Sequence, residues 1–151
     1  MNKFMKQAFK EAQRGINAGH GGPFGAVIVQ KGEIIAKGHN HVIAKQDPTC
    51  HGEIEAIRKA CKELGTFDLS GCELYTTGYP CPMCMGAILW ANIDKVYYGC
   101  NTLDAEDIGF RDKIFEEKLN DKDTTFCVEM DRSECLALYR EYKFKSNKEL
   151  Y

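Results

Sequence analysis

The sequence contains no apolar run long enough to cross a membrane, and residues 1–7 lack the apolar segment of a secretory signal peptide. It also lacks an excess of basic residues, because 20 Lys and Arg are offset by 22 Asp and Glu, which leaves a formal net charge of −2. We find no internal repeat, low-complexity tract or linker. These absences predict one cytoplasmic domain over residues 1–151, with no membrane partner and no nucleic-acid partner.

Cysteine, in contrast, is abundant, with eight residues in 151. In a reducing cytosol these cysteines are not expected to form a disulfide framework. Four of them lie in apolar surroundings and are expected to be buried free thiols: Cys61, Cys100, Cys127 and Cys135. For Cys50 and Cys72 two interpretations remain: a structural role, or a position near a functional site.

The other two cysteines, Cys81 and Cys84, lie in a Tyr-Pro-Cys-Pro-Met-Cys run. Pro82 suits the first position of a helix, where its fixed φ is already helical and no backbone N–H is needed. We therefore expect both thiols on one first helical turn, where the positive end of the helix dipole favours thiolate. Two thiolates at this spacing are half of a tetrahedral zinc site, although a redox pair or a structural zinc knuckle has the same spacing.

His51 and Glu53 open an earlier helix and supply the remaining groups. His51 brings the protein ligands to three, the number expected when zinc keeps a fourth position for water. Glu53 would carry protons beside that water. Taken singly, His51 reads as a helix cap and Glu53 as a solvated charge. Together with Pro-Cys-x-x-Cys, His-x-Glu is the signature of zinc nucleobase deaminases.

Hydrophobic periodicity and turn residues predict an α/β domain with a central sheet and helices on both faces. We expect strands over residues 24–29, 33–37, 73–77, 94–99 and 124–130. We expect helices over residues 2–18, from 47–49 to 64, over 82–91, near 114–119 and over 132–144. The tight strand–helix–strand unit around Cys81 implies a parallel pair of strands.

The chain resembles the cytidine-deaminase superfamily and, within it, the bacterial zinc-dependent guanine deaminases. The resemblance covers nearly the whole length and is most specific in the early block and at the end of the chain. It rests on residues 17–29, 47–49, 51–60, 80–90, 109–112 and 147–151. It implies a three-layer α/β/α cytidine-deaminase-like fold with a central five-stranded mixed sheet, one zinc ion per subunit and a purine base as substrate. It also implies a homodimer in which residues 132–151 are exchanged between subunits.

Carried over position by position, the resemblance implies roles for eight residues. His51, Cys81 and Cys84 would hold zinc, with Glu53 as the main proton shuttle. Asp112 would act near the exocyclic amine, Asn40 and Phe24 would bind and stack the base, and Tyr151 would cover the pocket. Without the resemblance, these last four would read as a solvated charge, a turn residue, a core residue and a frayed end.

The implied reaction is hydrolytic deamination of guanine to xanthine and ammonia. Guanosine, cytosine and adenosine in tRNA remain alternative substrates, and a zinc-stabilised protein without catalysis is an alternative of another class. Two residues depart from the family pattern: Gly52 stands where Ala is usual, and Tyr79 where Glu is usual. A glycine inside a helix costs about 1 kcal/mol relative to alanine. Tyr79 replaces a charge beside the metal turn, which leaves the exact substrate open.

Overall fold

The computed structural model describes residues 1–121 and 126–150. Most of the expected helices and strands are present, with ends shifted by a few residues. In chain order the elements are α1 Lys3–Asn17, β1 Gly25–Gln30, β2 Glu33–His39, α2 Val42–Lys45, α3 Gly52–Leu64, β3 Cys72–Gly78, α4 Pro82–Trp90, β4 Lys95–Cys100, α5 Thr102–Asp107, α6 Asp112–Asn120 and α7 Arg132–Lys143. Helices α2 and α5 were not expected from the sequence.

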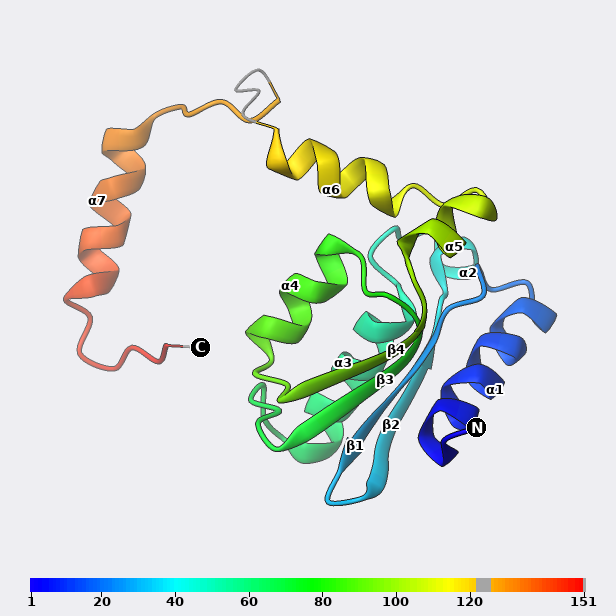
Figure 1. Cartoon of the computed structure of the whole chain (residues 1–151). Helices are drawn as coiled ribbons and strands as arrows, with labels where there is room; N and C mark the ends of the chain where they lie inside the picture. Colours follow the sequence, from blue (N-terminus) through cyan, green and yellow to red (C-terminus); the bar gives the residue numbers. More distant parts are fainter. Residues whose placement is uncertain (122–125, 151) are drawn as a thin grey trace.

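Within the described residues the sheet has four strands in the order β2-β1-β3-β4. β1 pairs antiparallel with both β2 and β3, whereas β3 and β4 run parallel, joined by α4. The expected mixed sheet and its parallel unit are therefore confirmed (Figure 1).

The expectation of five strands is wrong for the described chain. Residues 124 and 125 lie outside the described residues, and 126–130 form no strand. Residues 126–130 lead into α7 and lie away from the edge strand β4 (Figure 1). Apolar residues with β propensity form a strand only where a neighbouring strand accepts their backbone hydrogen bonds, and 126–130 have no such neighbour here.

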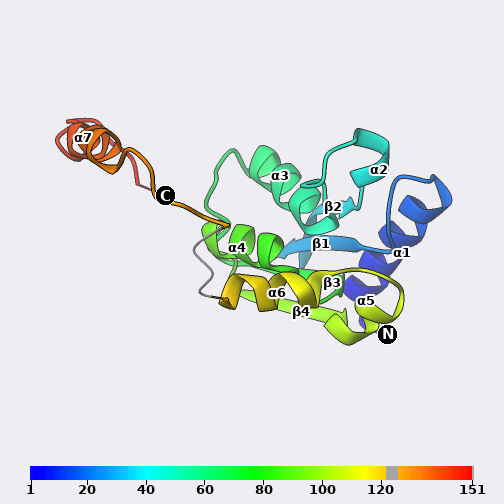
Figure 2. The same ribbon diagram turned by 90° about the horizontal axis from the view of Figure 1, so that it is seen from above.

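Successive side chains of β1 point to opposite faces of the sheet, and a hydrophobic core lies on each face. Ala26 and Ile28 face a cluster that includes Ala56 of α3 and Ile88 of α4. Val27 and Val29 face the opposite cluster, which contains Ala8 of α1. The period of two along a strand thus separates the helices into two layers around the sheet, and the expected three-layer arrangement is confirmed (Figures 1 and 2).

Helix α7 lies apart from the sheet and its covering helices in both views (Figures 1 and 2). Several of its apolar side chains are exposed, including Leu138 and Tyr139. The same exposure corrects the expectation for three cysteines. Cys100, Cys127 and Cys135 are exposed and Cys61 is half-buried, whereas Cys50 and Cys72 are buried. The exposed three lie on the edge strand or in the extended C-terminal part, where no second layer covers them.

In the described part of the chain, no helix has the length and apolar character needed to span a membrane.

Candidate metal centre and active site

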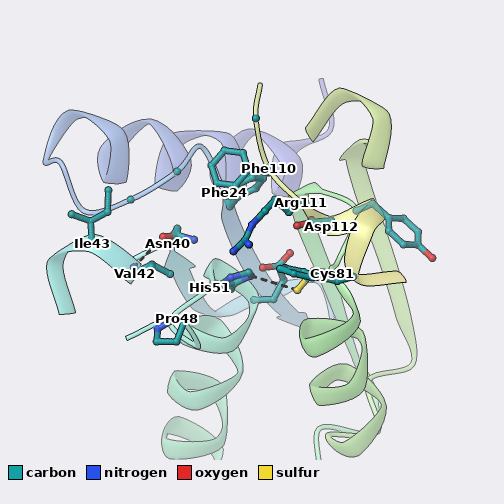
Figure 3. A pocket seen from close by; sticks show the side chains of 16 residues that line it. Phe24, Asn40, Val42, Ile43, Pro48, His51, Cys81, Phe110, Arg111 and Asp112 are labelled. Atoms are coloured by element: carbon teal, nitrogen blue, oxygen red, sulfur yellow. Dashed lines mark hydrogen bonds between the residues drawn. The ribbon is translucent and has the colours of Figure 1, made fainter. Parts of the chain in front are cut away.

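The first turns of α3 and α4 meet beyond the end of β3. His51 is the N-cap of α3, Cys81 is the N-cap of α4, and Pro82 occupies the start of α4 as expected. Among the described residues, His51, Cys81 and Cys84 form a group whose possible ligand atoms all lie within 4.8 Å of one another. The Sγ atom of Cys81 is 3.6 Å from Nδ1 of His51 (Figure 3).

A tight turn before α3 places His51. The Asp47 carboxylate accepts hydrogen bonds from the backbone N–H of Thr49, at 2.8 Å, and from the Thr49 hydroxyl, at 2.7 Å. Gly52 follows as the first residue of α3, so the cost of a glycine inside a helix does not apply. A Cβ atom there would lie 2.9 Å from the carbonyl oxygen of Phe24. Glycine therefore permits a close approach of the His51 turn to the start of β1.

The two thiols of the group differ in acidity. The hydrogen bond from Cys84, and then His51, lowers the pKa of Cys81 to about 4. The pKa of Cys84 is raised, because Cys84 donates to Cys81 and is buried beside Glu53. The pKa of His51 is raised by its hydrogen bond to Cys81. One thiolate is thus already favoured without a metal.

This donor set fits zinc. Two cysteine sulfurs and one imidazole nitrogen are typical zinc ligands, and three protein ligands leave one position for water or substrate, as in catalytic zinc sites.

Glu53 lies in the first turn of α3 and is only 4% exposed. Its Oε1 accepts a hydrogen bond from the Thr76 hydroxyl at 2.9 Å, and Oε2 is 3.6 Å from Sγ of Cys84. Burial raises the pKa of Glu53, opposed in part by the Thr76 hydrogen bond. The arrangement holds a carboxylate beside the three candidate ligands.

A cavity of about 510 Å³ opens over these groups, and His51, Glu53 and Cys81 are among the residues that line it (Figure 3). Its walls come from the loop before β1, the start of α2 and the segment before α6. They include Gly21, Gly22, Phe24, Asn40, Val42, Ile43, Pro48, Tyr79, Gly109, Phe110, Arg111, Asp112 and Phe115. The volume is suitable for a small ligand.

Phe24 and Asn40, two of the expected base-binding residues, both line this cavity. Asn40 is 4% exposed; its backbone N–H donates to the carbonyl of Phe24 at 2.9 Å, and its Oδ1 accepts from the N–H of Val42 at 3.0 Å. The Oδ1 atom is thus engaged by the backbone, which leaves the amide NH₂ as its donor group.

Asp112, the first residue of α6, also lines the cavity. Burial is the main cause that raises the pKa of this carboxyl, and the nearby charge of Cys81 adds to it. Tyr151, the remaining expected residue, lies outside the described residues.

Two wall residues were not singled out from the sequence. The ring of Phe110 packs edge-on against Phe24, with centroids 4.7 Å apart, and the Arg111 side chain projects into the cavity (Figure 3). The Gly109–Asp112 run was the available signal, but only its aspartate was given a role. Tyr79, one of the two departures from the family pattern, forms part of the wall and packs edge-on against Tyr98.

Comparison with known proteins is consistent with this geometry. Residues 1–100 match the model of the cytidine and deoxycytidylate deaminase zinc-binding region. The chain belongs to the cytidine and deoxycytidylate deaminase family. Its zinc-binding deaminase region contains the whole His51, Cys81 and Cys84 group.

Similarity to one member of the deaminase family spans essentially the whole chain. Guanine deaminase from Bacillus subtilis is 44% identical over 151 residues, which cover 98% of this chain and 97% of that protein. The X-ray structure of guanine deaminase from Bacillus subtilis superimposes with a TM-score of 0.93 at 43% identity, covering 100% of this chain and 99% of that one.

Other members of the deaminase family match a smaller part. A structure of guanine deaminase from Nitrosomonas europaea gives a TM-score of 0.69 at 34% identity and covers 72% of this chain and 63% of that one. The tRNA-specific adenosine deaminase of Aquifex aeolicus is 48% identical over 95 residues, which cover 63% of this chain and 62% of that protein.

Proposed function

We propose that this protein deaminates guanine hydrolytically, with guanine and water as reactants and xanthine and ammonia as products. The observation that carries the proposal is the extent of the similarity. The match to a guanine deaminase covers 98% of the chain, whereas the match to a tRNA-specific adenosine deaminase covers 63%. Residues 109–112, which form part of the cavity wall, lie beyond residues 1–100, the part that matches the family model.

Zinc is the metal proposed for the site, one ion per chain, held by His51, Cys81 and Cys84. When bound, it would supply Lewis-acid activation of a water molecule. The residues themselves favour this occupancy, because Cys81 already tends toward thiolate and His51 caps α3 without using its side chain in a capping hydrogen bond.

Glu53 is proposed as the proton shuttle. Its carboxylate accepts the proton of the attacking water, delivers a proton to the purine ring nitrogen and helps to protonate the departing amine. Thr76 holds one carboxylate oxygen, so the other is directed toward the metal ligands. Burial raises the pKa of Glu53, which suits a group that must both accept and donate protons near neutral pH.

The remaining residues are proposed to orient the base. Phe24, supported edge-on by Phe110, offers an aromatic face, and Asn40 offers an amide to a polar edge of the purine. Asp112 would accept a hydrogen bond from the exocyclic amine that leaves as ammonia. Tyr151 is proposed to cover the bound base.

We also propose a homodimer in which residues 132–151 of each chain pack on the other. The support is the position of α7, which stands away from the body with apolar side chains such as Leu138 and Tyr139 exposed (Figure 1). Burying such surface against a second copy would be favourable, and exchange of a terminal element is a low-cost route to a dimer.

Complementation between two defective chains tests the exchange. Glu53→Gln and Tyr151→Ala should each lose activity alone. After the two are unfolded and refolded together, a mixed dimer would pair an intact Glu53 with an intact Tyr151 from the partner, and activity should return. If the mixture stays as inactive as its components while light scattering shows a dimer, the segment is not exchanged.

A second substrate class is favoured by one observation, the 48% identity to a tRNA-specific adenosine deaminase over 95 residues. The net charge of −2 opposes it, because affinity for nucleic acid depends on neutralising phosphates.

Ammonia release from a matched panel distinguishes the possibilities. The panel contains guanine, guanosine, cytosine and an anticodon stem-loop with adenosine at the wobble position, each with and without chelator. Guanine should give the highest kcat/KM, and chelator should abolish it. A higher kcat/KM on the stem-loop would overturn the guanine assignment, and no ammonia from any member would favour a zinc-stabilised protein without catalysis.

A further inference from the structure

Three of the four histidines form a second cluster outside the candidate active site. His20 lies in the loop after α1, His39 ends β2, and His41 is the N-cap of α2. Their possible ligand atoms all lie within 4.8 Å of one another, and Nδ1 of His20 is 2.9 Å from Nε2 of His39. His39 is buried and the other two are half-buried, so the group is reachable from solvent.

Hydrogen bonds determine which ring nitrogen of His39 and of His41 carries the proton and which is unprotonated. Nδ1 of His39 is 3.0 Å from a carboxylate oxygen of Glu11, and Nδ1 of His41 is 2.9 Å from the backbone carbonyl of His39. Carboxylates and carbonyls only accept, so both Nδ1 atoms carry the proton. In each ring Nε2 is therefore unprotonated, and its lone pair can bind a metal ion. The same pattern, with the far N–H fixed by a carboxylate or carbonyl, surrounds histidines that bind metals.

Ordinary packing explains only part of this arrangement. A proton shared between His20 and His39 satisfies those two rings, and His41 lies against the ring of His39 with centroids 4.1 Å apart. It does not explain why three imidazoles whose possible ligand atoms lie within 4.8 Å of one another also lie beside two carboxylates. The second carboxylate is Glu55, with an oxygen 3.8 Å from Nδ1 of His41.

We propose that His20, His39 and His41 form a second metal site, for a divalent transition ion with an affinity for imidazole, such as Zn²⁺. The ion takes the place of the proton between His20 and His39, and that proton moves to Nε2 of His20. The His41 ring tilts out of its stacked position to present Nε2. Imidazole is a preferred ligand of zinc, copper and nickel, and tetrahedral zinc separates its nitrogen ligands by about 3.3 Å, slightly more than the present His20–His39 spacing. Glu11 then fixes the tautomer and the orientation of the His39 ring.

The position of the cluster gives the ion a structural consequence for the active site. Asn40 lies between His39 and His41, and the backbone carbonyl of His20 accepts hydrogen bonds from the N–H groups of Ile43 and Ala44, at 3.0 and 3.1 Å. Gly21, Asn40 and Ile43 line the cavity. An ion on the three histidines therefore joins the loop after α1 to the β2–α2 connection, and both segments line the cavity. This inference does not depend on guanine being the substrate.

Cobalt(II) titration of the chelator-stripped full chain distinguishes the two sites by spectrum. Cobalt on Cys81 and Cys84 gives a thiolate charge-transfer band, whereas cobalt on imidazoles gives visible bands without it. Wild type should bind two equivalents. The Cys81→Ser/Cys84→Ser variant should bind one without the charge-transfer band, and His20→Phe, which keeps a flat ring, should bind one with it.

Two further variants sharpen the result. His20→Cys restores a ligand and should recover the second equivalent with an added thiolate band. Glu11→Gln should weaken the second site by about 10–100-fold without affecting the first, as expected for a residue that orients a ligand. In wild type, the second equivalent should also slow amide exchange in residues 19–22 and 40–44.

A single equivalent in wild type would overturn the proposal. So would a second equivalent that survives both His20→Phe and His41→Asn, because it would then be bound elsewhere on the surface. Should His20→Phe fail to fold, His41→Asn alone decides between these outcomes.

Discussion

Thr76 donates its hydroxyl hydrogen to Glu53, joining the middle of β3 to the first turn of α3 over 2.9 Å in a fully buried contact. The sheet thereby fixes the carboxylate that stands beside His51, Cys81 and Cys84. A proton shuttle needs this restraint, because proton transfer requires hydrogen-bond reach to the reacting atoms throughout the cycle.

Removal of the Thr76 hydroxyl should therefore impair turnover more than binding. We expect Thr76→Val to lower kcat on guanine about tenfold or more, since a hydrogen bond to a charged group contributes about 1.5–3 kcal/mol. Steady-state kinetics should show a smaller change in KM. Thr76→Ser keeps the hydroxyl and is the matched control; equal losses in both variants would show that packing, and not the hydrogen bond, matters.

Glu53→Gln should retain the fold and the bound metal but lose nearly all turnover. General acid–base catalysis contributes roughly 10²–10⁴ in rate, and Glu53 is assigned more than one proton transfer. Metal content and circular dichroism establish that the site and fold are intact. A variant that keeps more than about a tenth of the wild-type kcat would remove Glu53 from the shuttle role.

Asp112→Ala should lower turnover on guanine by about tenfold or more with metal content unchanged, because the proposed contact to the leaving amine is lost. Asp107→Ala is the control, since Asp107 is an exposed acidic residue at the end of α5 and does not line the cavity. If both variants behave like wild type, Asp112 is a solvated charge.

The raised pKa of Tyr75 predicts that the folded chain loses stability in alkaline solution. Burial, and then its hydrogen bond to Glu73, raises the pKa of this phenol from 10 to about 12 in the folded chain. Between these values the unfolded chain binds fewer protons than the folded chain, so the free energy of unfolding falls as pH rises. Urea denaturation should show a smaller fall in Tyr75→Phe. Tyr139→Phe, at an exposed ring, should follow wild type; a Tyr75→Phe curve parallel to wild type would contradict the prediction.

The core of the site could be predicted from sequence because its determinants are local. Pro82 and the turn at Asp47 fix where two helices begin, and the cysteine spacing is read directly from the chain. The strand between the helices then brings Cys81 and Cys84 to His51. The same locality made the β3–α4–β4 unit predictable.

Features that depend on contacts distant in sequence could not be predicted. Thr76 restrains Glu53, and Phe110 packs on Phe24. No pattern in the sequence indicates that the two residues of either pair are in contact. Residues 126–130 have the composition of a strand but lack a neighbouring strand to pair with. The buried-thiol expectation for Cys100, Cys127 and Cys135 was wrong because an apolar neighbourhood in sequence does not guarantee a covering layer.

Helix α5 was missed for a different reason. Its signal was present, because Asn101 and Asp104 form a capping box, with the Asn101 side chain accepting from two backbone N–H groups. The helix is short, spanning Thr102–Asp107, and its apolar pattern is too brief to show a period.

Metal reconstitution with guanine as substrate tests the central claim most directly. Protein stripped by chelator is supplied with zinc in steps, while xanthine, ammonia and zinc content are measured. The account predicts no turnover without zinc, equal amounts of xanthine and ammonia as activity returns, and no recovery in the Cys81→Ser/Cys84→Ser variant. Full turnover in stripped protein or in that variant, or no xanthine at any zinc level, would contradict it.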